Sequence, residues 1–293
     1  MAIQTSVLET FSTVFTGEPR EDTVAPAETV AQSREDEYLN DLADVHGLDE
    51  SAVLSTVTSR SYGEMAARAL EGCGAGSDHV DVIILAYANT EFFIPKGAGS
   101  FLAEEFPSAK MVYAVTEQGK LAPFTALKLA QCHLQEEECE RAAVVAIEQR
   151  AVPLVDDHDA GKPEVDAAAA ILLSRDISAT STEMPSVALR KVGGQAELGP
   201  LVREMLRIVT AKLDGDPLIV IGERIPRGEA ASFSSRVHRA EAGRVCTGVW
   251  ETLDRSLRGD DGDGGDGGYS GPVLVMEYDP MLDQLGVASM IVP

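Results

Sequence analysis

The sequence has no long apolar run and few basic residues. Among its 293 residues, no apolar stretch approaches the ~18 residues that span a bilayer, and the first five residues carry no basic charge of the kind that opens a signal peptide. Lysine and arginine number 24 against 48 aspartates and glutamates, which gives a net charge of −24. Because this charge repels phosphate backbones and anionic lipid, we expect a cytoplasmic protein that binds neither nucleic acid nor membrane.

Cysteine is also scarce, and no two cysteines form a CxxC pair or show ligand-like spacing with the five histidines. The four are Cys73, Cys132, Cys139 and Cys246. An acidic, glycine-rich stretch at 258–268 lacks the glutamate that an EF-hand needs at its twelfth position. The sequence therefore predicts buried free thiols, an acidic surface loop, and neither a metal site nor a cofactor.

What the chain does have is an alternation of amphipathic helices with short, wholly apolar strands, which is typical of an α/β fold. In the first half the predicted helices are 61–73, 97–106 and one reaching about Cys139, and the predicted strands are 80–87, 111–115, 142–147 and 167–173. The second half repeats this more loosely, with helices at 198–213 and 243–257 and strands at 217–221, 272–278 and 285–292. We therefore expect two duplicated βαβαβ-type halves, residues 1–178 and 179–293.

One turn in this pattern lacks a residue that could act as a nucleophile. A buried strand turns sharply into an apolar helix within residues 112–130. At such a junction an α/β enzyme can hold a nucleophile at the positive end of a helix. The turn nevertheless contains no cysteine and no serine, only Thr116, Glu117, Gln118, Gly119 and Lys120. The chain is therefore either an enzyme with unfamiliar chemistry or a scaffold without its original chemistry.

Several segments, in order and spacing, together resemble the thiolase superfamily and within it the ketoacyl synthase III branch. They are Tyr62–Glu71 with Val80–Ala86, Val112–Val115 with Leu127–Ala130, Val165–Leu173, Gly271–Met276 and Leu285–Ile291. The resemblance implies two halves in a layered α-β-α-β-α arrangement. It also implies chemistry by a cysteine thiolate that becomes acylated, with a histidine and an asparagine that stabilise an oxyanion.

None of these three catalytic residues is found where the resemblance places them. The cysteine position falls at Gly119, the histidine position at Gly222–Arg224 with Glu223 at its centre, and the asparagine position around Ala242. Cys132 and Cys139 lie 13 and 20 residues beyond Gly119, which is roughly 20 and 30 Å along a helix. Cys132 and Cys139 are therefore too far from Gly119 to take the place of the catalytic cysteine.

The charged residues expected around the vacant site leave two interpretations open. Glu117, Lys120, Glu223 and His238 are alternative catalytic candidates, because a carboxylate beside a cation can act as an acid/base pair. The same residues can equally form an ion pair that fills space once held by a substrate.

Arginines give the stretch 223–244 a cationic character within a strongly acidic chain. In the family that the chain resembles, basic residues in this region dock phosphopantetheine, coenzyme A phosphates or an acidic carrier protein. The resemblance therefore makes Arg224, Arg227 and Arg244 candidates for binding acyl-coenzyme A or an acyl carrier protein. They can also simply meet another acidic partner.

Three functions follow as hypotheses. The first is a non-catalytic partner subunit, comparable to a chain-length factor, that forms a homo- or heterodimer with a ketosynthase-like subunit in polyketide or fatty-acyl metabolism. The second is an acyltransferase that acts on an acyl thioester without a cysteine nucleophile, with Glu117, Glu223 or His238 as base. The third is a binding module that senses acyl thioesters without turnover.

Overall fold

A computed structural model gives the fold of the chain. It describes residues 4–15, 41, 60–75, 79–89, 91, 97–136, 138–150, 163–176, 186–213, 215–259 and 269–292. Most of the first sixty residues and most of the acidic, glycine-rich stretch lie outside the described residues, as does the expected boundary at 178. No helix of the described part is both long and apolar enough to cross a membrane.

Five strands of the first half form one mixed sheet in the order β1-β5-β4-β2-β3. The strands are β1 (Gln4–Phe15), β2 (Val82–Ala86), β3 (Met111–Val115), β4 (Arg141–Glu148) and β5 (Asp166–Asp176). Its helices are α3 (Tyr62–Gly72), α4 (Ala98–Glu105) and α5 (Ala122–Leu134), and a short 3₁₀ turn, η1 (Gly119–Leu121), leads into α5. Strand β1, near the start of the chain, pairs antiparallel with β5.

The second half forms a second mixed sheet in the order β6-β10-β9-β7-β8. The strands are β6 (Val187–Lys191), β7 (Leu218–Ile221), β8 (Val237–Arg239), β9 (Gly271–Asp279) and β10 (Gln284–Val292). The helices are α6 (Gln195–Thr210), α7 (Arg227–Ala231) and α8 (Gly248–Arg258). Strands β6 and β8 were absent from the sequence prediction because each is short and carries charged residues.

The two sheets have the same topology. In each, the strand next to one edge pairs parallel with both of its neighbours, β2 with β3 and β4, and β7 with β8 and β9. In each, the last strand is antiparallel to both of its partners, β5 to β1 and β4, and β10 to β6 and β9. Within the described residues both halves are thus βαβαβαββ units, two strands and one helix longer than the βαβαβ core expected from the sequence.

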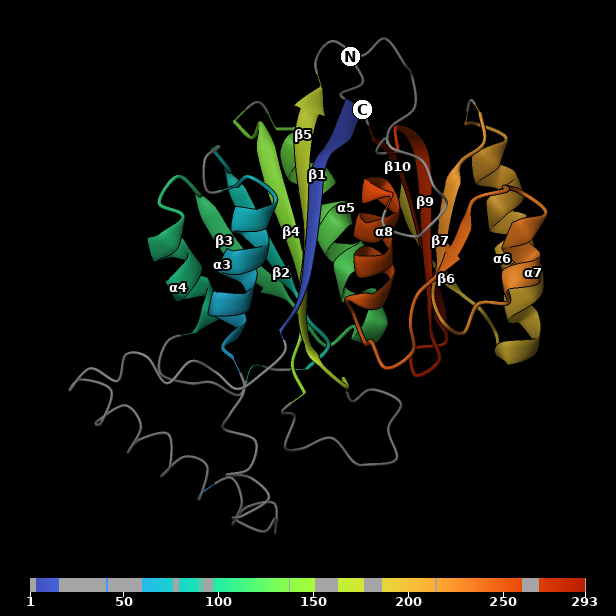
Figure 1. The fold of residues 1–293 in the computed structure, drawn as a ribbon, viewed down its shortest axis with the longest axis horizontal. Coiled ribbons are helices and arrows are strands. Elements are labelled where there is room, and N and C mark those ends of the chain that lie inside the picture. The colour runs from blue at the N-terminus through green and yellow to red at the C-terminus, as the bar shows by residue number, and fades with distance from the viewer. Residues whose placement is uncertain are drawn as a thin grey trace.

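The halves stack as five layers, helices, sheet, helices, sheet and helices (Figure 1). Helices α3 and α4 cover the outer face of the first sheet, and α6 and α7 cover that of the second. Helices α5 and α8 lie between the sheets, where Phe124 and Trp250 pack ring against ring with centroids 5.1 Å apart. This shared central layer is why α5 is buried almost all round.

Local signals explain where the helices begin and end. Ser61 and Glu64 form a capping box at the start of α3, and Gly74 takes a left-handed conformation (φ 76°) just past its end. One expectation was wrong: α5 ends at Leu134, so Cys139 lies in the connection to β4 and not on the helix. The polar, acidic run after Leu134 offers no further apolar face to continue it.

Candidate functional site

The candidate site lies where β3 turns into α5, at the level of the central layer. Glu117 and Gly119 both adopt positive φ, 61° and 50°, which makes the turn sharp. The side chain of Glu117 is exposed, and Gln118 accepts a hydrogen bond from the Thr125 hydroxyl. Gly119 thus lies at the amino end of the helix, where the first backbone N–H groups have no partner within the helix itself.

A carboxylate from the second half fills the space above this tip. A Cβ placed on Gly119 would lie far inside van der Waals contact of the Asp279 carboxylate, which extends from the end of β9. Asp279 is itself fixed, since its carboxylate accepts the main-chain N–H groups of Lys120, Met281 and Leu282 at 2.8, 2.8 and 2.9 Å. The position is therefore both empty of a nucleophile and closed to one.

The same strand closes a second position. A Cβ on Gly222, directly after β7, would collide with the carboxylate of Glu277. Glu277 is 4% exposed, and burial raises its pKa to about 7, while the nearby Lys120 lowers it. Neighbouring Glu223 and Asp279 raise it further. A third turn glycine, Gly243, is covered in the same way by Glu164.

Lys120 provides the positive charge at the centre of this cluster. Its ammonium group is 5% exposed and donates to Glu223 at 3.3 Å and to the carbonyl of Arg244 at 3.0 Å. It also lies close enough to Glu277 to influence its titration. Because a buried ammonium ion needs partners to offset its lost hydration, Lys120 links three segments that are distant in the sequence.

A second buried carboxylate occupies the amino end of α8. One oxygen of Glu148, the last residue of β4, accepts the main-chain N–H groups of Val245, Cys246 and Thr247 at 2.8, 2.7 and 3.2 Å. Burial raises its pKa to about 7 against the opposing effect of these hydrogen bonds. Burial likewise holds the pKa of the Cys246 thiol well above its usual range, so this thiol stays protonated and is unsuited to act as a nucleophile.

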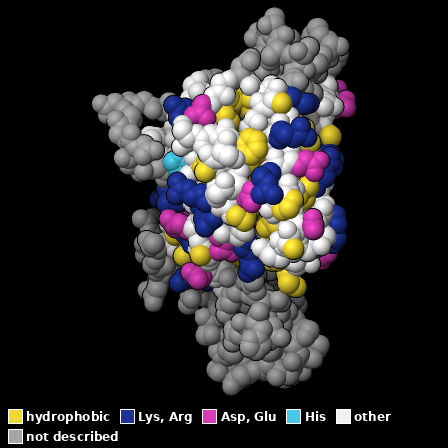
Figure 2. All heavy atoms as spheres, turned by 90° about the vertical axis from the view of Figure 1, so that its right-hand side faces the viewer, with side chains coloured by type: hydrophobic (Ala, Val, Ile, Leu, Met, Phe, Trp, Pro, Cys, Tyr) yellow, Lys and Arg dark blue, Asp and Glu magenta, His cyan; other side chains and the backbone are white. Residues whose placement is uncertain are grey.

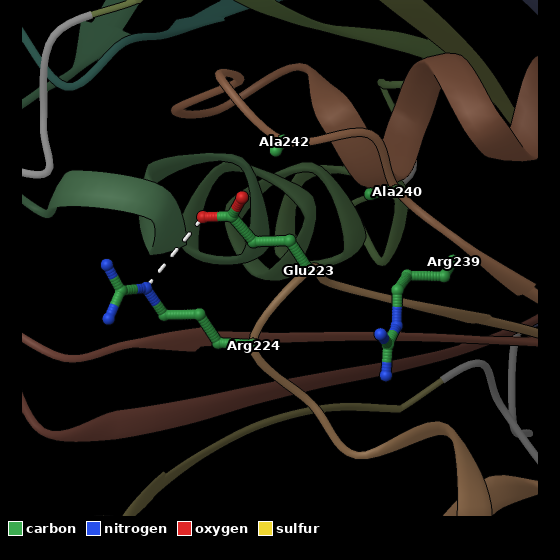
Figure 3. Close-up of a pocket in the computed structure, with 5 residues that line it drawn as sticks. All are labelled: Glu223, Arg224, Arg239, Ala240 and Ala242. Atoms are coloured by element: carbon green, nitrogen blue, oxygen red, sulfur yellow. Dashed lines mark ion pairs between the residues drawn. The ribbon is translucent and has the colours of Figure 1, made fainter.

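An open hollow of about 390 Å³ lies beside the cluster (Figure 3). Glu223, Arg224, Arg239, Ala240 and Ala242 line it. Glu223 forms a long ion pair with Arg224 (3.8 Å), and Arg239 points away from this pair. The hollow is thus lined by charged groups and alanines, with no large apolar side chain to receive an acyl chain.

The structure separates the residues that the sequence suggested as one site. Lys120 and Glu223 are brought together, while Glu117 faces solvent and His238 lies on β8 in a different hollow. Arg224 and Arg227 are exposed. Arg244, by contrast, is 10% exposed and forms an ion pair with Glu251 at 3.0 Å, so its charge is balanced within the protein.

Sequence reasoning missed the acidic residues that fill the site, namely Glu148, Glu277 and Asp279. Each comes after an apolar run of its strand, Ala142–Ile147 in β4 or Val273–Met276 in β9. An acidic residue at such a strand end, beside the site that parallel strands share, is the signal that could have pointed to them. That Gly119 lies against Asp279 and Gly222 against Glu277 could be seen only in the folded structure.

This architecture of two equivalent βαβαβαββ halves around two central helices is a thiolase-like fold of the ketoacyl synthase III type. It matches 3-oxoacyl-(acyl carrier protein) synthase III, FabH, from Pseudomonas aeruginosa PAO1 with a TM-score of 0.61 and 15% identity, over 99% of this chain and 98% of that one. It also matches AbyA1, a tetronic acid condensing enzyme, with a TM-score of 0.61 and 13% identity over 98% and 100% of the two chains.

A further match is OleA from Xanthomonas campestris, in a structure with bound lauric acid and lauroyl-CoA, with a TM-score of 0.56 and 13% identity over 98% and 99% of the chains. These structural neighbours are condensing enzymes. No family model matches the sequence, and no curated protein matches it. The similarity to these proteins is therefore one of fold.

Proposed function

We propose that this protein is a non-catalytic partner subunit of a condensing enzyme in polyketide-type or fatty-acyl metabolism. The observation that carries the proposal is the contact of Asp279 with Gly119. A residue with any side chain at this position would have to displace a carboxylate that is held by three backbone hydrogen bonds. The tip of the helix where a condensing enzyme needs its thiolate is thus occupied from within.

The electrostatics of the two central helices support the same conclusion. An oxyanion that forms in a reaction needs unpaired N–H donors, and helix amino ends supply them. Here Asp279 accepts the first free N–H before α5, and Glu148 accepts three at the start of α8. These N–H groups already bond to carboxyl groups of the protein itself, which compete with a second anion for them.

The open edge of the first sheet is where we place the partner. Strand β3 is the last strand of its sheet and pairs with β2. Met111 is 47% exposed and Ala114 is also exposed, so this strand, at the edge of its sheet among the described residues, presents apolar side chains. Such an edge is a template for a strand of another chain. Because β3 leads directly into the site turn, a partner there would sit next to it.

Co-purification tests this role. We expect the chain, co-expressed with a cysteine-containing ketosynthase encoded beside it, to form a stable complex and to change the length of the acyl product. Met111→Lys should abolish the complex, because it puts a charge on the edge strand. Met281→Lys, at a methionine that is 72% exposed on the β9–β10 turn, is the matched control and should leave it intact. A ketosynthase that neither binds the chain nor alters its product in its presence would refute the proposal.

The second candidate, an acyltransferase without a cysteine, is favoured by the pair of Lys120 and Glu223. Glu223 is 25% exposed and lines the hollow, so its carboxylate can reach a bound acceptor, while the contact with Lys120 holds it in position. The acyl group would pass directly from the thioester to an acceptor whose proton Glu223 removes. Glu223→Gln should then lower turnover of an acyl-coenzyme A substrate by about 10²-fold or more. Turnover that is unaffected by this change would eliminate Glu223 as the base.

A further inference from the structure

Two non-glycine residues of the described chain have a left-handed backbone conformation, and they differ in what holds them there. They are Asp283 (φ 49°) and Glu117 (φ 61°). The Asp283 carboxylate accepts the main-chain N–H groups of Gly193 and Gly194 at 3.0 and 3.1 Å, and the hydroxyl of Tyr278 at 3.2 Å. These contacts inside the protein offset the backbone strain at Asp283.

Glu117 has no such contacts. Its side chain is exposed, and within the described part of the chain it takes part in no hydrogen bond or ion pair. A glycine would adopt the same φ without strain. The glutamate therefore costs the chain stability, and no interaction among the described residues offsets that cost. A charged side chain at such a position points to a contact outside the chain.

The strand that leads to Glu117 is unlike the other edge strands of the described structure. The edges are β1 and β3 in the first sheet and β6 and β8 in the second. Strand β1 contains Glu9, β6 contains Arg190 and β8 contains Arg239, and charged residues discourage an edge strand from pairing with another chain. Strand β3 contains no charged residue. It is therefore the edge strand best suited to pair with another chain.

The charge at the other end of β3 is already balanced. Lys110, directly before the strand, donates to the carboxylate of Asp81 at 2.9 Å and to the carbonyl of Glu138 at 2.6 Å. Glu117 is thus the charge beside β3 that no described residue balances. A second copy of the chain, paired antiparallel through its own β3, would bring Lys110 toward Glu117, and that cation is already engaged.

The outer face of the second half provides a contrast. Figure 2 shows Lys and Arg side chains there among Asp and Glu, with apolar side chains scattered between them. Exposed cations of this half also have acidic partners, since Arg203 pairs with Glu229, and Lys191 pairs with Asp283 at 3.5 Å. Such a face is typical of a solvated surface, whereas the surface at β3 is apolar with one open charge.

We propose that Glu117 forms an ion pair with a lysine or arginine of the subunit that pairs with β3. This inference rests on the partner-subunit role proposed above and specifies the chemistry of that partner, which is an apolar edge strand with a cation at the β3–α5 turn. Because docking removes water from the pair, its attraction exceeds that of an exposed ion pair. A strand without the cation would leave Glu117 covered and unpaired, so the pair also selects among partners.

Calorimetric titration of the full chain with the ketosynthase encoded beside it tests the inference. Glu117→Gln should weaken the complex about tenfold or more, since it removes one charge of a desolvated pair. The remaining affinity should depend less on sodium chloride than that of the parent chain. Glu204→Gln, at an exposed glutamate on α6, is the matched control and should change neither quantity.

A second variant separates binding from folding. Glu117→Gly should weaken the complex as much as Glu117→Gln does, because both remove the carboxylate. The urea midpoint of the free chain should nevertheless hold or rise, because glycine adopts the φ of 61° without strain. A residue that serves its own fold would show the opposite change in the midpoint.

The possible failures are distinguishable. A complex whose affinity is unchanged in Glu117→Gln would overturn the ion pair and leave the partner-subunit role standing. An equal loss of affinity in Glu204→Gln would also overturn it, because the partner would then sense only net charge. A fall in the urea midpoint of Glu117→Gly would assign the glutamate to the fold of its own chain. If the parent chain forms no complex, this inference falls together with the proposed function.

Discussion

Asp279 accepts the main-chain N–H of Lys120 at 2.8 Å, although the two residues are 159 positions apart, and its carboxylate covers Gly119. One aspartate at the end of β9 thereby joins the two halves at the turn between β3 and α5. The proposed role as a non-catalytic partner subunit depends on that contact.

Restoring a thiol at the turn should fail. We expect Gly119→Cys to destabilise the protein by roughly 2 kcal/mol or more, because the new Cβ meets Asp279 and a non-glycine residue at φ 50° adds strain. Urea unfolding measures the loss, and mass spectrometry after incubation with an acyl thioester should find no acylated thiol. The matched control is Gly99→Ala in α4, where a Cβ meets nothing within 4 Å and stability should hold or rise. A stable, readily acylated Gly119→Cys would contradict the closed site.

Removing the central cation should be costly. Lys120→Met leaves Glu223, Glu277 and Asp279 without their shared positive neighbour, and we expect a loss of about 3–5 kcal/mol in the free energy of unfolding near pH 8. The loss should shrink at lower pH, where Glu277 becomes protonated. Urea unfolding at several pH values follows both effects. Combining it with Glu223→Gln should recover part of the loss, and a double variant with the sum of the two single losses would show that the residues are not coupled.

The raised pKa of Glu277 gives a signed pH dependence. Between its ordinary value of 4.5 and about 7, the folded protein holds a proton that the unfolded chain releases, so this group stabilises the fold at low pH and the benefit declines as pH rises to about 7. The slope approaches about 1.4 kcal/mol per pH unit. Glu277→Gln should lose this slope, so the difference in unfolding free energy between variant and parent should change with pH by the same amount, as measured by urea unfolding from pH 4 to 8. Glu105→Gln, at an exposed glutamate, should not.

A buried aspartate ties the first strand to the central layer. Asp254 on α8 is 2% exposed and accepts hydrogen bonds from Thr10, from both the N–H and the hydroxyl of Ser12, and from Arg258. Asp254→Asn turns an acceptor into a donor facing donors, so we expect a loss of about 2 kcal/mol. Amide hydrogen exchange should accelerate at Ser12 and remain slow at Ala143 in β4. Unchanged exchange at Ser12 would mean that the pairing of β1 with β5 holds the strand without Asp254.

Much of the fold was predictable because its signals are local. Apolar runs such as Val82–Ala86 predict strands buried on both faces, and the capping residue Ser61 and Gly74 mark the limits of α3. Strand β8 was missed because, with its His238 and Arg239, it does not have the composition of a buried strand. Its place in the sheet comes from pairing with β7, which local patterns do not contain.

The candidate site, like the fold, was predictable from the sequence only in part. The sequence by itself determined that no cysteine or serine stands in the turn at Gly119 and that the chain repeats its pattern of helices and strands. Only the tertiary structure decided what stands in place of a nucleophile, that Arg244 turns inward, and that Lys120 meets Glu223 but not His238. The physical reason is that a strand end and a helix tip more than 150 residues apart come into contact only when the two halves close around α5 and α8.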